Sequence, residues 1–133
     1  MPVLLNMSAP ADRKYLQTHE WHRLDGDTVT IGITQFAADE LTDITYVDFK
    51  VKPGDKLPAN GRFGEIESVK TTSDLYSGVA GTVAEVNNEL SKNPGLVNSN
   101  PYDQGWMIKV RVTNKADLDR LLSADEYGKK TGH

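Results

Sequence analysis

The chain has 133 residues, of which 38% are hydrophobic and 26% are charged, a size and balance that fit one domain with a single core. Its net charge is −4 and its basic residues are scattered, which disfavours nucleic-acid binding because phosphate neutralisation supplies most of that affinity. No apolar run approaches the roughly 20 residues that span a bilayer, and the first residues do not form a signal peptide. We therefore expect a cytoplasmic protein without a membrane partner, or a mitochondrial matrix protein only if a presequence has been removed.

The absence of cysteine excludes disulfides, thiolate metal sites and a cysteine nucleophile. Any sulfur redox chemistry would therefore have to come from a cofactor. His19 and His22 lie close together, but with only three histidines a metal site is not expected. The sequence contains no Gly-x-Ser-x-Gly elbow, no Gly-x-Gly-x-x-Gly fingerprint and no Walker loop, so no catalytic residue is predicted.

The predicted elements begin, in chain order, with an aperiodic tail over residues 1–13 and an extended entry segment over residues 15–24. Thr34 can cap a short helix over residues 35–41, because its hydroxyl can accept a hydrogen bond from a free N–H of the first turn. Alternation of apolar and polar residues between Gly- or Pro-containing turns predicts the strands. These are residues 28–33, 44–51, 63–69, 75–86 and 106–112.

In the last of these strands, Trp106 and Ile108 are predicted to share one face, with Met107 opposite. Asn114 can cap a helix reaching Leu122, and Ser123 can cap a last short turn. The predicted organisation is a flexible N-terminal tail over 1–13, one domain over 14–128 and a frayed C-terminus over 129–133. Short strands with small peripheral helices indicate a mainly β protein, an antiparallel sandwich or flattened barrel.

Lys70 stands out because it joins two predicted strands within a short, polar segment. We expect it at or near a hairpin tip with its amine in water. A solvated surface lysine is the ordinary interpretation of such a residue. The functional alternative is an accessible primary amine held on a rigid hairpin. The nearby carboxylates of Glu65, Glu67 and Asp74 are likewise explained by a solvated acidic rim, so spacing alone does not establish a site.

The segment Glu67-Ser68-Val69-Lys70-Thr71-Thr72-Ser73-Asp74-Leu75-Tyr76 resembles the lipoylation segment of the glycine cleavage system H protein family. The resemblance runs in consistent order and spacing from about Tyr15 to Tyr127. Gly78 departs from it, since family members usually have proline there. Further matching segments are His19-Glu20-Trp21, residues 29–34, Phe63-Gly64, Gly81, residues 83–87, Leu96-Val97-Asn98, Pro101-Tyr102 and residues 105–109.

The resemblance implies a lipoyl-domain-like fold, a barrel-sandwich hybrid with a C-terminal helix, and lipoic acid attached covalently to Lys70. It implies a carrier rather than an enzyme. The carrier would take the aminomethyl intermediate of glycine from a pyridoxal-phosphate glycine decarboxylase, the P protein, to a folate-dependent aminomethyltransferase, the T protein. The resulting dithiol would go to dihydrolipoyl dehydrogenase, the L protein. The alternatives are a lipoyl donor or relay protein for other lipoyl-dependent complexes and an unmodified interaction module.

The resemblance also suggests roles for five further residues. Glu20 and Asp74, with Thr18, are expected to line a cleft that shelters the intermediate, because a carboxylate near an amine favours its charged form. An ordinary surface acid is the alternative for Glu20 and for Asp74. Glu67 and Gly81 are expected to help the lipoate-attaching enzymes recognise the hairpin, Glu67 by presenting charge and Gly81 by permitting the backbone shape.

Overall fold

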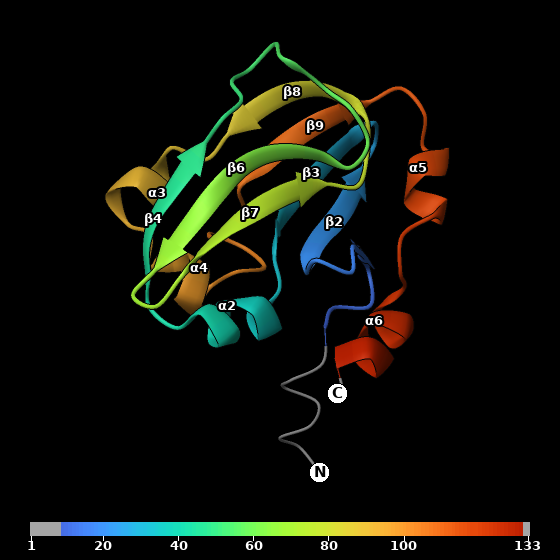
Figure 1. Ribbon diagram of the computed structural model, residues 1–133. Helices are drawn as coiled ribbons and strands as arrows, with labels where there is room; N and C mark the ends of the chain where they lie inside the picture. The colour runs from blue at the N-terminus through green and yellow to red at the C-terminus, as the bar shows by residue number, and fades with distance from the viewer. Residues whose placement is uncertain (1–8, 132–133) are drawn as a thin grey trace.

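The computed structural model describes residues 9–131, which fold into two antiparallel sheets packed against each other (Figure 1). The larger sheet has the order β1-β2-β3-β9-β8-β5 and the smaller sheet the order β4-β6-β7. The strands of the larger sheet are β1 Lys14–Tyr15, β2 Glu20–Asp25, β3 Thr28–Ile33, β5 Lys56–Leu57, β8 Gly81–Val86 and β9 Ile108–Val112. Those of the smaller sheet are β4 Ile44–Phe49, β6 Gly61–Ser68 and β7 Thr72–Ser77.

Short helices lie at the periphery, so the predicted mainly β sandwich with small helices is confirmed (Figure 1). Thr34 caps α2 as predicted, its Oγ1 accepting the Ala37 N–H at 3.2 Å. Ser123 and Glu126 form a reciprocal capping box at the start of α6. The helices are α2 Gln35–Leu41, α3 Glu89–Lys92, α4 Leu96–Ser99, α5 Ala116–Asp119 and α6 Ala124–Thr131.

The main core fills the space between the two sheets. Val29 and Ile31 from β3 meet Ile66 and Leu75 from the smaller sheet, and all four are almost fully buried. Burying each such side chain contributes roughly 1.5–3 kcal/mol to folding. Because residues alternate along a strand, the apolar residues of β3 supply this core while their polar neighbours face the other way.

A second cluster lies around Tyr15, Trp21 and Tyr127, on the side of β2 that faces away from Glu20. The rings of Tyr15 and Tyr127 stack with centroids 4.8 Å apart, which docks α6 onto the start of the larger sheet. The Arg13 guanidinium lies 4.4 Å from the Trp21 ring centre. The last residues of the predicted tail are therefore held against the domain, whereas residues 1–8 lie outside the described part of the chain.

The predicted single strand over residues 75–86 is wrong. It is two strands, β7 in the smaller sheet and β8 in the larger one, joined by a short crossing. Ser77 Oγ donates to the Val79 carbonyl at 2.7 Å and accepts the Val79 N–H at 3.2 Å, which closes a local loop where the ladder stops. The alternating pattern continues through the crossing, so periodicity could not locate this change of sheet.

Two predictions near the C-terminus are also wrong. Met107 and Ile108 both pack in the main core, whereas Trp106 packs against the second cluster, so Trp106 and Ile108 do not share a face opposite Met107. The Met107 N–H donates to the Ile31 carbonyl at 2.8 Å just before β9 begins. The predicted helix to Leu122 ends earlier, since α5 is a single turn and Leu122 forms a β-bridge with Tyr15. Helix α6 continues to Thr131, into the stretch predicted to fray, and the last two residues lie outside the described part.

Among the described residues, the outer edge of β7 and of the segment after it pairs with no strand, and side chains from β2 and α5 contact it instead. The backbone N–H groups of alternate residues donate to side-chain acceptors, which replace the carbonyls of a missing neighbour. The pairs are Tyr76 to Glu20 Oε2 at 2.8 Å, Gly78 to His22 Nε2 at 2.9 Å and Ala80 to Asp117 Oδ2 at 2.9 Å. Glu20 therefore connects β2 to β7 and contributes to the fold, in addition to any role in a functional site.

Candidate functional site

Lys70 lies at the tip of the hairpin formed by β6 and β7, where the sequence places it. Ser68 Oγ accepts the N–H groups of Lys70 and Thr71 at 3.2 and 3.1 Å, and the Ser68 N–H donates to the Thr71 carbonyl at 2.8 Å. The Lys70 side chain is exposed, and its Nζ makes no hydrogen bond or ion pair with any residue of the described range 9–131. The backbone of the tip is thus fixed while its amine is free to react.

A cleft of about 210 Å³ opens beside this hairpin, between α2, the start of β2 and strands β6 and β7. Most of its wall is apolar, and its polar groups come mainly from the turn before β2 and from β7. Asp74 lies four residues from Lys70, roughly 13 Å along an extended strand. The lining residues are Thr18, His19, Glu20, Ile33, Phe36, Ala37, Glu40, Leu41, Ile66, Ser73, Asp74 and Leu75.

Glu20 is the buried carboxyl group of this cleft. Its Oε1 accepts the Thr18 hydroxyl at 2.5 Å and its Oε2 accepts the Tyr76 N–H at 2.8 Å, and the residue has no exposed surface. Desolvation raises the pKa of Glu20 from 4.5 to about 7, against the opposing effect of these hydrogen bonds. No cation in the described part of the chain forms an ion pair with it. Thr18 and Glu20 therefore lie together, as the resemblance suggested.

Asp74 lies at the rim of the same cleft, but its carboxylate is hydrogen-bonded to residues that do not line the cleft. Arg62 Nε donates to Asp74 Oδ1 at 2.9 Å, and the same guanidinium donates to Glu65 at 2.8 Å. The Tyr76 hydroxyl also donates to Asp74, at 3.3 Å. Because Leu75 between them is buried in the core, Asp74 and Tyr76 face the outer side of β7. The structure therefore separates the Asp74 carboxylate from Glu20.

Glu67 and Gly81 lie far apart along the chain path, Glu67 near the tip of the β6–β7 hairpin and Gly81 beyond the far end of β7. Glu67 is exposed near the tip, and its carboxylate forms no ion pair among the residues that the structure describes. Gly81 begins β8, beyond β7 and a turn, with about 17 Å of strand alone separating it from the tip. A Cβ at Gly81 would collide with the carbonyl oxygen of Arg111 in β9, so sheet packing explains this glycine.

His19 and Phe36 line the cleft without having been singled out as site residues. His19 has a left-handed backbone with φ 82°, its Nδ1 lies 2.8 Å from the Tyr127 hydroxyl, and its ring lies 5.1 Å from that of Phe36. The Tyr127 hydroxyl also lies 2.7 Å from Thr34 Oγ1. Burial raises the pKa of Tyr127 to about 12 and lowers that of His19. Helix α6 thus holds His19 in the wall of the cleft through Tyr127. Because Tyr127 is distant from His19 in the chain, local sequence patterns could not reveal this contact.

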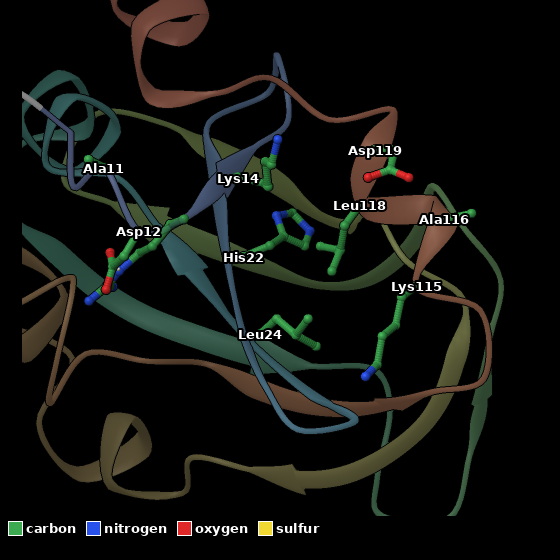
Figure 2. A pocket seen from close by; sticks show the side chains of 10 residues that line it. Ala11, Asp12, Lys14, His22, Leu24, Lys115, Ala116, Leu118 and Asp119 are labelled. Atoms are coloured by element: carbon green, nitrogen blue, oxygen red, sulfur yellow. Dashed lines mark hydrogen bonds and ion pairs between the residues drawn. The ribbon is translucent and has the colours of Figure 1, made fainter.

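A larger, more open hollow of about 530 Å³ lies beside β1, β2 and α5 (Figure 2). Figure 2 shows the His22 ring between Lys14 and Leu118, with Asp119 and Lys115 near the two ends of α5. The hollow contains both signs of charge, and no residue of the β6–β7 hairpin lines it. Burial lowers the pKa of His22 to about 4, which leaves its ring neutral. We place the functional site at the smaller cleft, which adjoins the hairpin of Lys70.

Neither a metal site nor a membrane span emerges from the geometry. Within residues 9–131, no three or more His, Asp or Glu side chains are grouped so that they could hold a metal ion. No helix in the same range is both long enough and apolar enough to cross a membrane.

Two facing sheets, an exposed lysine on a capped hairpin and a largely apolar cleft beside it define a carrier domain of the lipoyl type. The family model described as "Glycine cleavage H-protein" matches residues 13–133, and the chain belongs to this family. The Glycine cleavage system H protein of Staphylococcus carnosus is 46% identical over 95% of this chain and 99% of its own length. That of Carboxydothermus hydrogenoformans is 49% identical over 90% of this chain and 92% of its own length.

The fold is shared with a solved relative as well. The crystal structure of a glycine cleavage system H protein from Mycobacterium marinum superposes with a TM-score of 0.85 and 34% identity. The match covers 94% of this chain and all of that one. The chain is therefore a lipoyl carrier of the glycine cleavage system, a non-catalytic component whose family carries a covalently attached lipoyl-lysine. Its partners are the P, T and L proteins of that system.

Proposed function

We propose that Lys70 carries the lipoyl group and that the cleft beside the hairpin receives the end of the arm. The observation that carries this proposal is the exposed Lys70 side chain on a tip whose backbone is held by Ser68. The nearby cleft has mainly apolar walls and one buried acid, which suits an arm that loses the lysine charge on acylation. The lipoyl group supplies the sulfur redox chemistry that this cysteine-free chain lacks.

In this proposal Glu20 stabilises the amine of the cargo in its protonated form. A cationic amine in the cleft would favour the ionised state of Glu20 and lower its raised pKa, so cargo binding and loss of the Glu20 proton are coupled. Thr18 keeps the carboxyl group oriented by donating to Oε1. Keeping the amine charged withholds the lone pair that would expel the cargo from sulfur, so the cleft slows premature loss.

We assign Asp74 a weaker part at the rim. Its carboxylate is already paired with Arg62 and accepts the Tyr76 hydroxyl on the outer face. Asp74 therefore contributes chiefly a long-range negative potential at the mouth, which salt screens more strongly than a buried contact. The substitution Asp74→Asn should change cargo loss less than Glu20→Gln.

We further propose that the lipoate-attaching enzymes contact Glu67 directly. Its carboxylate is exposed, without an ion pair among the described residues, and lies three positions before Lys70. Gly81 acts on recognition only through the shape of the sheet, because it lies beyond the far end of β7. We also propose a cytoplasmic location, in line with the bacterial origin of the relatives. Fractionation of the native host tests that location, and recovery in another compartment would contradict it.

The test of the attachment site is lipoylation of the purified chain by a lipoate-attaching enzyme, followed by peptide mass measurement. Lys70→Arg should abolish the adduct, because a guanidinium is a poor acyl acceptor, and should leave the fold unchanged. Lys92→Arg, on an exposed residue of α3, is the matched control and should be lipoylated normally. A lipoyl adduct on another lysine of the Lys70→Arg variant would overturn the assignment.

The test of the shelter is the rate at which the loaded, isolated carrier loses its amine cargo. Glu20→Gln should accelerate this loss several-fold, because the amide is isosteric but cannot stabilise the cation. Glu85→Gln, an exposed acid in β8, is the control and should leave the rate unchanged. Equal loss from the wild type and Glu20→Gln would refute the role of Glu20 without affecting the assignment of Lys70.

A further inference from the structure

The tip that bears Lys70 has a second anchor outside its own hairpin. The Val69 N–H donates to the Asp43 carbonyl at 3.0 Å, and Asp43 lies in the short connection between α2 and β4. This hydrogen bond joins the residue immediately before Lys70 to a neighbouring segment. The position of the Asp43 carbonyl therefore bears directly on where the lysine backbone lies.

Asn98 clamps that connection on both sides of Asp43. Its Nδ2 donates to the Thr42 carbonyl at 2.8 Å, and its Oδ1 accepts the Ile44 N–H at 2.9 Å. Thr42 has φ 64°, a left-handed conformation that a β-branched residue rarely adopts and that needs support from its surroundings. One amide side chain thus uses both of its hydrogen-bonding ends to hold a strained turn.

The same residue is tied to the helix that forms a wall of the cleft. The Asn98 carbonyl accepts Gln35 Nε2 at 3.2 Å, and its Nδ2 lies 3.5 Å from the Ala38 carbonyl. Both partners belong to α2, which contributes Phe36 and other residues to the cleft. Figure 1 shows α2 and α4 side by side next to the end of the β6–β7 hairpin. Asn98 therefore contacts both the connection around Asp43, which holds the Lys70 tip, and helix α2, which forms a wall of the cleft.

We propose that Asn98 is a positioning residue that sets the location of the Lys70 tip relative to the cleft. This inference rests on the proposed role of Lys70 as the attachment point. It gives a physical reason for the Leu96-Val97-Asn98 segment, which resembles the family but lies far from the lysine in sequence. Val97 anchors the segment by complete burial, and Asn98 transmits that anchoring to the tip.

The test compares Asn98→Ala with Asn87→Ala. Asn87 is a matched control, because its Nδ2 also bridges two backbone carbonyls, those of Gln104 and Trp106. Within residues 9–131, none of these three residues forms a hydrogen bond with residues 68–71. Amide hydrogen exchange at Val69 and Ile44 should become roughly tenfold faster in Asn98→Ala, since two hydrogen bonds that hold this segment are lost. In Asn87→Ala, the Val69 amide should exchange at the wild-type rate.

Lipoylation kinetics give a functional readout of the same pair. A mobile tip must be ordered when the attaching enzyme binds it, so Asn98→Ala should raise KM for the carrier several-fold and change kcat little. Loss of amine cargo should also accelerate, whereas Asn87→Ala should match the wild type in both assays. Unchanged Val69 exchange, or equal KM in both variants, would overturn the role of Asn98. Absence of lipoylation at Lys70 in the wild type would instead refute the proposed attachment site. The hydrogen exchange of the Val69 amide would still test whether Asn98 positions the tip.

Discussion

Replacing the buried Glu20 by glutamine should change how the stability of this protein depends on pH. Glutamine is isosteric, and its amide can accept the Tyr76 N–H and donate to the Thr18 hydroxyl, so the connection between the sheets is preserved. What the substitution removes is the titration of a carboxyl group without exposed surface. The difference between the two proteins therefore isolates the desolvation of Glu20.

The expected magnitude follows from the raised pKa of Glu20. A change from 4.5 in the unfolded chain to about 7 in the folded protein corresponds to roughly 3 kcal/mol in favour of the protonated form. The folded state holds this proton more tightly, so the stabilisation is present below about pH 4.5 and is lost as pH rises through 7. The free energy of unfolding of Glu20→Gln relative to wild type should therefore increase by about 3 kcal/mol between about pH 4 and pH 8.

The assay is urea denaturation of both proteins across that pH range, with two-state behaviour checked by two probes. The carboxyl groups of Asp55, Asp117 and Glu126 have lowered pKa values from backbone N–H hydrogen bonds, so they weaken both proteins in acid and cancel in the difference. Glu85→Gln, on an exposed acid of β8, is measured alongside as the control for the loss of a surface carboxylate. A difference for Glu20→Gln that stays constant within about 0.5 kcal/mol would show that Glu20 is hydrated and would remove the basis for its coupling to a cationic cargo.

Three other substitutions give independent tests of the hairpin and its supports. Gly81→Ala should lower the free energy of unfolding by roughly 1–3 kcal/mol through a clash with β9, and any remaining folded protein should still be lipoylated; full stability would refute the packing explanation. Ser68→Ala should speed hydrogen exchange of the Lys70 and Thr71 amides roughly tenfold, and wild-type exchange there would refute its role as a cap. Tyr127→Phe should lose about 1–2 kcal/mol in urea denaturation, because its hydroxyl has two partners, and an unchanged midpoint would contradict their importance.

Much of the fold follows from signals that lie within a few residues of each other. The alternation over residues 28–33 identified β3, and the Thr34 hydroxyl identified the start of α2. The polar segment around Lys70 identified a hairpin tip. These features are local, because strand alternation, helix capping and tight turns each depend on the nearest neighbours in the chain.

Strand periodicity failed at two places in the chain. The run over residues 75–86 keeps its alternation while Ser77 closes a loop and the chain changes sheets. Met107 follows the alternation in sequence, but it packs in the main core together with Ile108, whereas Trp106 packs against the second cluster. A period of two predicts neither a hydrogen bond that closes a loop nor the core in which a side chain packs.

Composition and strand alternation were enough to predict a small mainly β domain without cysteine, and the ordered resemblance to a family singled out Lys70. Which acid of the cleft is buried depends instead on how distant strands pack together. Glu20 and Asp74 look alike as carboxylates in sequence, but Glu20 is desolvated between two sheets whereas Asp74 is paired with Arg62 on the outer face. The burial and the partners of each acid are set by segments distant in the chain, and burial raises the pKa of Glu20.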